Sequence, residues 1–207
     1  MFEILYSTTD CERTRASWSK WLKAAKKMRR DLSEEWGFDP LYYNETASVG
    51  FLVAAAGRAK LLALPEFTET NRKLPTGRSR AGRCDLWLAD PADGSDWVIE
   101  FKLHWMRPGS RAGLKKSMNK AIKAAFERDR QEAGSRFACT MYVPWTPSSK
   151  GSGFYAAEDF EDVHARLTEL ATKVDMAFVL GGADRPVHFL CTRIPPRSKD
   201  LGRLEIR

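Results

Sequence analysis

The sequence predicts an α/β fold in which a mixed central sheet is flanked by helices. The runs 83–88 and 97–103 are rich in aromatic and branched residues and are separated by turn-forming residues, a pattern typical of a β-hairpin. The segment 114–126 has apolar residues at helical spacing and is followed by the apolar run 136–143. A helix should therefore connect one strand of the hairpin to a parallel neighbour, so that the sheet contains both antiparallel and parallel strands.

Two helices and one core strand are expected before the hairpin, and residues 2–6 form either a short strand or a hydrophobic tether. The first helix extends from about residue 9 to about residue 30, and a second helix runs from about Asn44 to Lys60. A strand then follows from Leu61 to Glu69, in which Pro65 indicates an edge position or a bulge. The first helix is basic on the side opposite its apolar stripe, and it either grips phosphate groups or packs on the core with a solvated basic face. Its basic residues are Lys20, Lys23, Lys26, Lys27, Arg29 and Arg30.

The chain beyond the crossover is expected to complete the same domain. After the core strand 136–143, apolar residues at spacings of three and four predict a helix over about 160–174, and two strands follow at 176–180 and 187–194. A chain of 207 residues is long enough for one domain with a substantial core. We therefore predict a single domain over residues 1–207, with a core of about 44–143 and an N-terminal helical extension of about 8–36.

Composition and charge limit the classes of protein that the chain can belong to. Lys and Arg total 34 against 27 Asp and Glu, a formal net charge of +7 that favours a polyanionic partner. No apolar run approaches the roughly 20 residues needed to span a bilayer, and the N-terminus lacks the apolar region of a signal peptide. The four cysteines are scattered, without CxxC or zinc-type spacing. These features predict a cytoplasmic protein that does not bind membranes.

Charged residues occur on one face of the predicted hairpin. Side chains alternate along a strand, so the strand 97–103 has one apolar face, and its other face carries Glu100 and Lys102. In the preceding strand, Asp85 faces away from the apolar residues. Pairing of the two strands would place Asp85 beside Glu100. Two carboxylates and a lysine on one sheet surface suit a divalent metal and a phosphate.

This arrangement resembles the PD-(D/E)XK nuclease superfamily, which has the restriction-endonuclease-like fold. Its signature is an acidic residue at the start of one strand and Glu/Asp-x-Lys on the next, here Asp85 and Glu100-Phe101-Lys102. The resemblance covers about residues 45–143 and departs from the signature at Cys84, which stands where the motif name has proline. It implies an αβββαβ core and hydrolysis of phosphodiester bonds in DNA with Mg²⁺ or Mn²⁺ as cofactor. The expected products have 5′-phosphate and 3′-hydroxyl ends.

The resemblance also implies a role for each residue of the signature. Asp85, Glu100 and the backbone carbonyl of Phe101 would hold the metal. Lys102 would position or polarise the attacking water and offset the negative charge that develops in the reaction. Asp85, Glu100 and Lys102 are therefore the expected catalytic residues.

Two residues are candidates for a further acidic ligand of the metal. Members of the superfamily often complete the metal site with an acidic residue from the first core helix, which nominates Glu45 in the predicted first turn of the helix that starts near residue 44. Glu45 could instead merely complement the helix dipole. Glu66, next to Pro65, is the rival ligand, but a bulge there could turn it either way and its strand face is mixed, so Glu45 is the predicted ligand.

Nucleic acid is the expected partner, and basic residues near the signature are the expected contacts. They lie in the predicted loop 71–82, just after it, and in the helix 114–126, although a solvated turn and a solvated helix face would have the same composition. The residues are Arg72, Lys73, Arg78, Arg80, Arg83, Lys116 and Lys120.

An alternative function keeps the same fold without catalysis. The chain would then be a nucleic-acid-binding or scaffolding subunit of a larger defence or mobile-element complex. A homodimer or a protein partner is compatible with either function. The chain has seven tryptophans, and exposure of several of them would favour a role in binding a protein partner.

Overall fold

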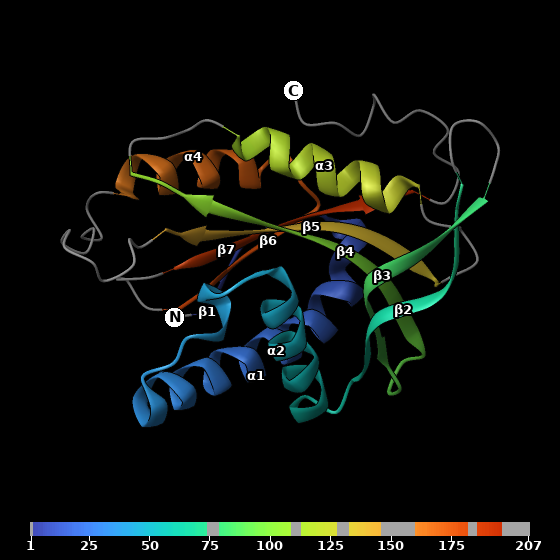
Figure 1. The fold of residues 1–207 in the computed structure, drawn as a ribbon, viewed down its shortest axis with the longest axis horizontal. Coiled ribbons are helices and arrows are strands. Elements are labelled where there is room, and N and C mark those ends of the chain that lie inside the picture. The colour runs from blue at the N-terminus through green and yellow to red at the C-terminus, as the bar shows by residue number, and fades with distance from the viewer. Residues whose placement is uncertain are drawn as a thin grey trace.

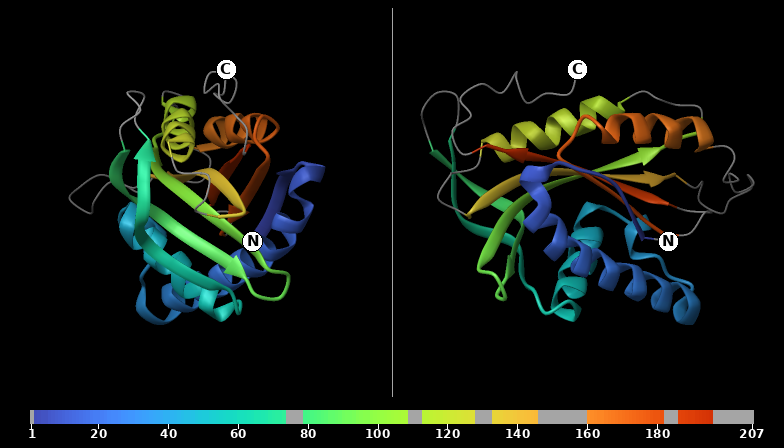
Figure 2. Two further views of the ribbon diagram at one scale, coloured as in Figure 1. Left: turned by 90° about the vertical axis from the view of Figure 1, so that its right-hand side faces the viewer. Right: turned by 180° about the vertical axis from the view of Figure 1, so that it is seen from behind.

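A computed structural model describes residues 2–73, 79–108, 113–127, 133–145, 160–181 and 186–195. In these ranges the chain forms one seven-stranded sheet with helices on both faces (Figure 1). Helices α1 (Glu12–Trp36) and α2 (Glu45–Arg58) cover one face, and α3 (Leu114–Phe126) and α4 (Glu161–Ala171) cover the other. The three layers are also seen from the side and from behind in Figure 2. The predicted α/β fold with a mixed sheet flanked by helices is therefore confirmed.

The strands lie in the spatial order β1-β6-β7-β5-β4-β3-β2. Only β4 and β5 are parallel among these neighbours, and α3 connects them as predicted. The chain order α2-β2-β3-β4-α3-β5 is also the predicted one. The strand bounds are Phe2–Ser7 (β1), Leu62–Lys73 (β2), Ser79–Asp90 (β3), Ser95–Met106 (β4), Ser135–Pro144 (β5), Met176–Leu180 (β6) and Val187–Ile194 (β7). Two short 3₁₀ helices, η1 (Thr9–Cys11) and η2 (Pro40–Tyr42), precede α1 and α2.

Aromatic residues of α1 form the centre of the core on the α1/α2 face. Trp18 and Trp21 are buried and meet edge to face, with ring centroids 5.7 Å apart. Trp21 also donates its indole N–H to the carbonyl oxygen of Leu52 in α2 at 2.7 Å. This contact fixes α2 against α1. The helix α1 ends later than predicted, at Trp36, and Gly37 after it has φ +61°, the left-handed conformation common just past helix ends.

A second core fills the space between the sheet and α3 and α4. Leu114, Met118 and Ile122 of α3 are buried there at the predicted helical spacing. The hydroxyl of Tyr142 in β5 donates to the carbonyl oxygen of Leu114 at 2.7 Å, which places the first turn of α3 over β5. None of the helices in the described ranges is long and apolar enough to cross a bilayer.

The β2–β3 hairpin differs from the predicted loop. Strand β2 extends to Lys73 and β3 begins at Ser79, so most of the predicted loop 71–82 is paired strand, as in the partners Arg72↔Arg80. The loop prediction was wrong there because ladder hydrogen bonds join backbone groups, whatever side chains a segment carries. The edge position of β2 and a register shift between Phe67 and Thr70 agree with the expectation drawn from Pro65.

Candidate active site

The candidate site forms where β3 and β4 stop pairing with each other. In the described sheet their register runs from Asp90↔Ser95 to Leu86↔Ile99, whereas β3 continues to pair with β2 beyond this point. Backbone groups of alternate residues point to the same side of a strand, so the N–H groups of Phe101 and Leu103 face the side from which β3 has departed. Both N–H groups need another acceptor.

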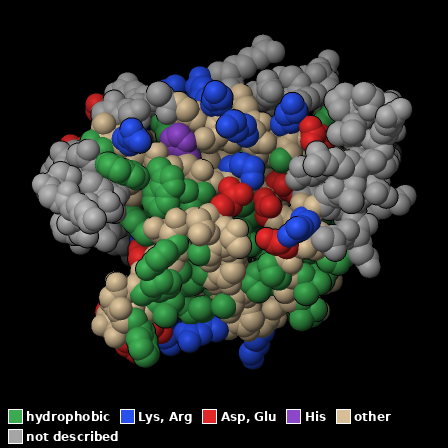
Figure 3. Space-filling model, in the orientation of Figure 1, with side chains coloured by type: hydrophobic (Ala, Val, Ile, Leu, Met, Phe, Trp, Pro, Cys, Tyr) green, Lys and Arg blue, Asp and Glu red, His purple; other side chains and the backbone are tan. Residues whose placement is uncertain are grey.

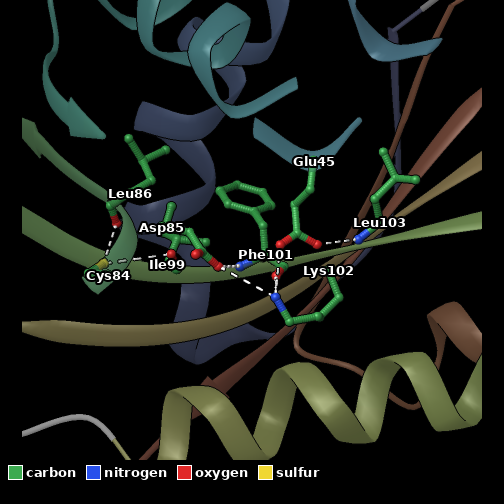
Figure 4. Close-up of polar contacts among 8 residues, drawn as sticks. All are labelled: Glu45, Cys84, Asp85, Leu86, Ile99, Phe101, Lys102 and Leu103. Carbon is green, nitrogen blue, oxygen red and sulfur yellow. Dashed lines mark hydrogen bonds and ion pairs between the residues drawn. The ribbon is translucent and has the colours of Figure 1, made fainter. Parts of the chain in front are cut away.

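Two carboxylates replace the missing strand. Asp85 accepts a hydrogen bond from the N–H of Phe101 at 2.8 Å through Oδ2, and Glu45 accepts one from the N–H of Leu103 at 2.9 Å through Oε2 (Figure 4). Asp85 comes from β3, and Glu45 comes from the first turn of α2. The position of that turn is fixed by Asn44, whose side chain accepts a hydrogen bond from the N–H of Ala47 at 2.8 Å.

Lys102 lies between these two carboxylates. Its Nζ is 2.9 Å from Oε1 of Glu45 and 3.9 Å from Oδ2 of Asp85 (Figure 4). The same Nζ donates a hydrogen bond to the carbonyl oxygen of Phe101 at 2.5 Å. One ammonium group is thus surrounded by oxygen atoms from α2, β3 and β4. Its positive charge offsets the repulsion between two carboxylates that are held close together.

Phe101 connects the site to the core. Its side chain is buried with Ile99 on the α1/α2 face, while its N–H and C=O take part in the site. Leu103 is partly buried against the same core, so the apolar face of β4 is arranged as predicted.

Glu100 is buried to a degree that the sequence did not indicate. Glu100 is 1% exposed, and it is the register partner of Ala138 in β5. Alternation places it on the α3 face of β4 with Lys102 and His104. The side chains of Lys102, Asp85 and Glu45 are brought together around one point, and Glu100 is a buried residue of the same strand as Lys102.

The oxygen atoms around Lys102 Nζ have the chemistry that Mg²⁺ and Mn²⁺ prefer, because two carboxylates and a carbonyl are hard ligands. Within the described ranges, however, no three His, Cys, Asp or Glu side chains are grouped so that they could hold a metal ion. The donor atoms of Asp85, Glu45 and the carbonyl of Phe101 are oxygens, the type of ligand that the predicted Mg²⁺ or Mn²⁺ prefers. In this arrangement the ammonium of Lys102 supplies the positive charge.

An open pocket of about 320 Å³ adjoins the two carboxylates. Figure 3 shows acidic side chains next to basic ones in the middle of this face of the molecule. The side chains of Glu45, Glu66 and Asp85 line the pocket together with Thr46, Val49, Gly50 and Pro65. Gly50 leaves part of the wall open, since a Cβ built there would meet no atom within 4 Å. The pocket was not predicted, although a glycine in the middle of a helix is a signal that could have drawn attention to it.

Glu66, the rival acidic residue, has a different partner. It has φ +47°, which is uncommon for a residue other than glycine, and it pairs with Arg83 at 2.6 Å on the surface. Glu66 thus lines the pocket that Glu45 and Asp85 share, but its carboxylate forms its ion pair with Arg83, whereas Glu45 pairs with Lys102. The geometry brings Glu45, rather than Glu66, to the lysine.

His104 lies two residues beyond Lys102 on the same face of β4. Its Nδ1 is 2.7 Å from the hydroxyl oxygen of Ser117 in α3, and the ring lies against Tyr142 with centroids 5.5 Å apart. Burial lowers the pKa of His104 below its usual value, so the imidazole is neutral at pH 7. Its partner Ser117 was not among the predicted residues.

The predicted nucleic-acid contacts that the structure describes are spread over α3, β2 and β3. Lys116 and Lys120 are exposed on α3, and Arg83 is exposed on β3 in its ion pair with Glu66. Arg72, Lys73 and Arg80 lie on the strands of the β2–β3 hairpin, with side chains outside the described part of the structure. Arg78 lies outside the described residues altogether.

Comparisons with known proteins add no identification to this geometry. No protein family model, curated protein or solved structure matches the chain.

Proposed function

We propose that the protein is a metal-dependent nuclease with the restriction-endonuclease-like fold of the PD-(D/E)XK superfamily, and that it hydrolyses phosphodiester bonds in DNA. The observation that carries the proposal is the position of Lys102 Nζ, within 4 Å of carboxylate oxygens from both Asp85 and Glu45. The order α2-β2-β3-β4-α3-β5, with a parallel β4–β5 pair, supports the fold assignment. The net charge of +7 supports a polyanionic substrate.

The side chains have complementary tasks in this proposal. Lys102 interacts with the non-bridging oxygens of the scissile phosphate and offsets the charge that develops on them. Asp85 and Glu45 orient Lys102 and contribute oxygen ligands, together with the carbonyl of Phe101. A bound Mg²⁺ or Mn²⁺ would supply Lewis-acid activation of the phosphate and of the attacking water. Glu100, the other predicted ligand, is 1% exposed and would contribute its carboxylate from the buried part of β4.

The open pocket beside Asp85 gives the substrate access to these groups. Its volume of about 320 Å³ is at the lower end of the range for small-molecule sites, about 300–1,000 Å³. That volume accommodates a nucleotide unit rather than a whole duplex. The rest of the nucleic acid would follow the basic residues Arg83, Lys116 and Lys120 outside the pocket.

A cleavage assay tests the proposal directly. Plasmid DNA and labelled oligonucleotides are incubated with the wild-type protein in Mg²⁺, in Mn²⁺ and in EDTA, and with Lys102→Ala, Asp85→Ala and Glu100→Ala. Each variant should lose at least about 100-fold in rate, the size of effect seen when one electrostatic contact to a transition state is removed. Lys173→Ala, an exposed lysine of the segment after α4, is the matched control and should cleave normally.

Two results would contradict the proposal. Cleavage that persists in EDTA would exclude the metal, and normal cleavage by the Asp85 and Lys102 variants would exclude this site. Binding of DNA without cleavage under every metal condition would favour the alternative function, a nucleic-acid-binding subunit.

The tryptophans bear on that alternative. Trp18, Trp21 and Trp97 are buried in the core, whereas Trp36 at the end of α1 is 75% exposed. The others with described side chains, Trp87, Trp105 and Trp145, are partly buried. A single strongly exposed tryptophan among the described residues gives the protein-partner role less support than several would.

A further inference from the structure

Helix α1 presents a positively charged surface in addition to the candidate active site. Lys23, Lys26, Lys27 and Arg30 follow one another at helical spacings of three and four, so their side chains share one side of the helix. They line a hollow of about 460 Å³, and all the described side chains that line it are basic. We refer to these four residues as the α1 basic surface.

The charges of this surface are poorly compensated. Several other cations of α1 have carboxylate partners, such as Arg15 with Glu12 and Lys20 with Asp90. Arg30 is close to Asp31 and Glu34, but among the described residues no ion pair is formed by Lys23, Lys26 or Lys27. Like charges at spacings of three and four destabilise a helix. The chain therefore keeps a repulsive arrangement that an anionic ligand would relieve.

The other side of α1 holds this surface in place. Trp18, Trp21, Leu22 and Ala25 are buried, so the apolar side of the helix is used in the core. A helix that inserts into lipid needs an exposed apolar face. Between Lys20 and Arg30 every exposed side chain of α1 is a cation, which favours a hydrophilic polyanion over a lipid surface.

The α1 basic surface is separate from the candidate active site. The backbone of α1 lies near β1 and β6, and its buried Trp18 reaches Trp97 of β4, whereas the backbone of α2, which carries Glu45, lies near β2, β3 and β4. The hollow and the pocket share no lining residue among the described side chains. Seen from behind, α1 lies across the lower part of the molecule, in front of α2 (Figure 2).

We propose that the α1 basic surface is a second binding surface for the sugar–phosphate backbone of nucleic acid. Lys23 and Arg30 are seven residues apart, which is about 10 Å along the helix axis and enough for contacts to several phosphates. Contacts of this kind are independent of sequence and give affinity that depends steeply on salt. Binding here does not require cleavage, so the inference stands or falls separately from the nuclease activity.

The test measures DNA binding without cleavage. Fluorescence anisotropy with a labelled 30-base-pair duplex in EDTA, at salt concentrations between 50 and 200 mM, compares four proteins. They are the wild type, the triple variant K23Q/K26Q/K27Q, the same three positions changed to arginine, and the control R13Q/K60Q/K173Q. The control removes three exposed cations elsewhere, so it has the same net charge as the glutamine variant. Circular dichroism checks that every variant is folded.

If all three lysines contact phosphates, the slope of log affinity against log salt should be smaller by about 2–3 in the glutamine variant. The wild type should then lose about 40-fold more affinity than this variant between 50 and 200 mM salt. The arginine variant should bind like the wild type, and the control should change affinity by less than about twofold.

Three outcomes would overturn the inference. They are absence of DNA binding by the wild type, an equal loss in the control and glutamine variants, and a glutamine variant that binds DNA normally. A parallel measurement with vesicles of phosphatidylserine and phosphatidylcholine separates the classes of partner. Vesicle binding that depends on these lysines, while DNA binding does not, would assign the surface to membranes and overturn the proposal.

Discussion

The ion pair between Lys102 and Glu45 should stabilise the folded protein measurably, and a double-mutant cycle can isolate its contribution. The changes are Lys102→Met, which keeps most of the aliphatic stem, and Glu45→Gln, which removes the charge. Gln can still accept the hydrogen bond from the N–H of Leu103. The cycle therefore measures the interaction of the charges across 2.9 Å and not the loss of the backbone contact.

The size of the effect follows from the exposure of the pair. The two side chains are 33% and 34% exposed, so water screens them in part. Exposed pairs contribute about 0.2–1 kcal/mol, whereas removal of one partner of a buried pair costs about 3–5 kcal/mol. We expect a coupling energy of about 1–2 kcal/mol, which in a domain of this size corresponds to a change in Tm of about 2–8 °C.

Urea denaturation in EDTA at pH 7 gives the four free energies of unfolding that the cycle needs. Arg83→Met and Glu66→Gln form the control cycle, because that pair is 67% and 50% exposed and should couple by less than about 0.5 kcal/mol. A coupling for Lys102 and Glu45 that is no larger than the control value would refute the electrostatic reasoning. It would also remove the main geometric support for Glu45 in the site.

Three further predictions concern activity and stability. Glu45→Gln should weaken metal-dependent cleavage substantially and Glu66→Gln should change it little, because of these two carboxylates Glu45 pairs with Lys102 and Glu66 pairs with Arg83. Cleavage kinetics in Mg²⁺ would show the reverse ranking if this assignment is wrong. Gly50→Leu should fill the pocket and lower cleavage at least about tenfold without loss of stability, whereas Gly57→Leu on the same helix lies outside the pocket and should have no such effect. Stability should fall by up to about 4–5 kcal/mol as the pH is lowered from about 6.5 to 3, and His188→Leu should remove much of this loss in urea titrations.

Stability should fall at low pH because of the surroundings of His188. Burial, together with the adjacent His164, lowers the pKa of His188 to about 3. The two rings are stacked, with Nδ1 of His164 at 2.8 Å from Nε2 of His188. Below pH 6.5 the unfolded chain binds a proton at this position and the folded chain does not, so stability is present above pH 6.5 and is lost towards pH 3. A variant that loses stability over this range as steeply as the wild type would contradict the role of His188.

The hairpin was predictable because its pattern is local. Alternation along a strand has a period of two residues, so the sequence assigns Ile99 and Phe101 to one face and Lys102 to the other without any knowledge of distant contacts. The observed register Leu86↔Ile99 also places Asp85 at the level of this part of β4. For the same reason the helical spacing of α3 and its role as a crossover could be read from residues close together in the chain.

The contacts of the carboxylates could not be predicted in this way. Glu45 and Lys102 are 57 residues apart, and their contact depends on how α2 packs over the sheet. That packing is set by contacts such as Trp21 with Leu52, which no local pattern reveals. The positive φ of Glu66, which lies between the paired residues Pro65 and Phe67 of β2, is likewise not indicated by any local pattern.

The departure of β3 from β4 accounts for the position of the whole site. A strand that loses its neighbour exposes N–H and C=O groups, and leaving them without partners in a partly buried position is unfavourable. Here the N–H groups of Phe101 and Leu103 are satisfied by Asp85 and Glu45, and the carbonyl of Phe101 is satisfied by Lys102. The charged residues therefore complete the hydrogen bonding of β4 as well as forming the candidate site. Since Phe101 also packs its side chain into the core, the position of these charges is tied to the core on the α1/α2 face.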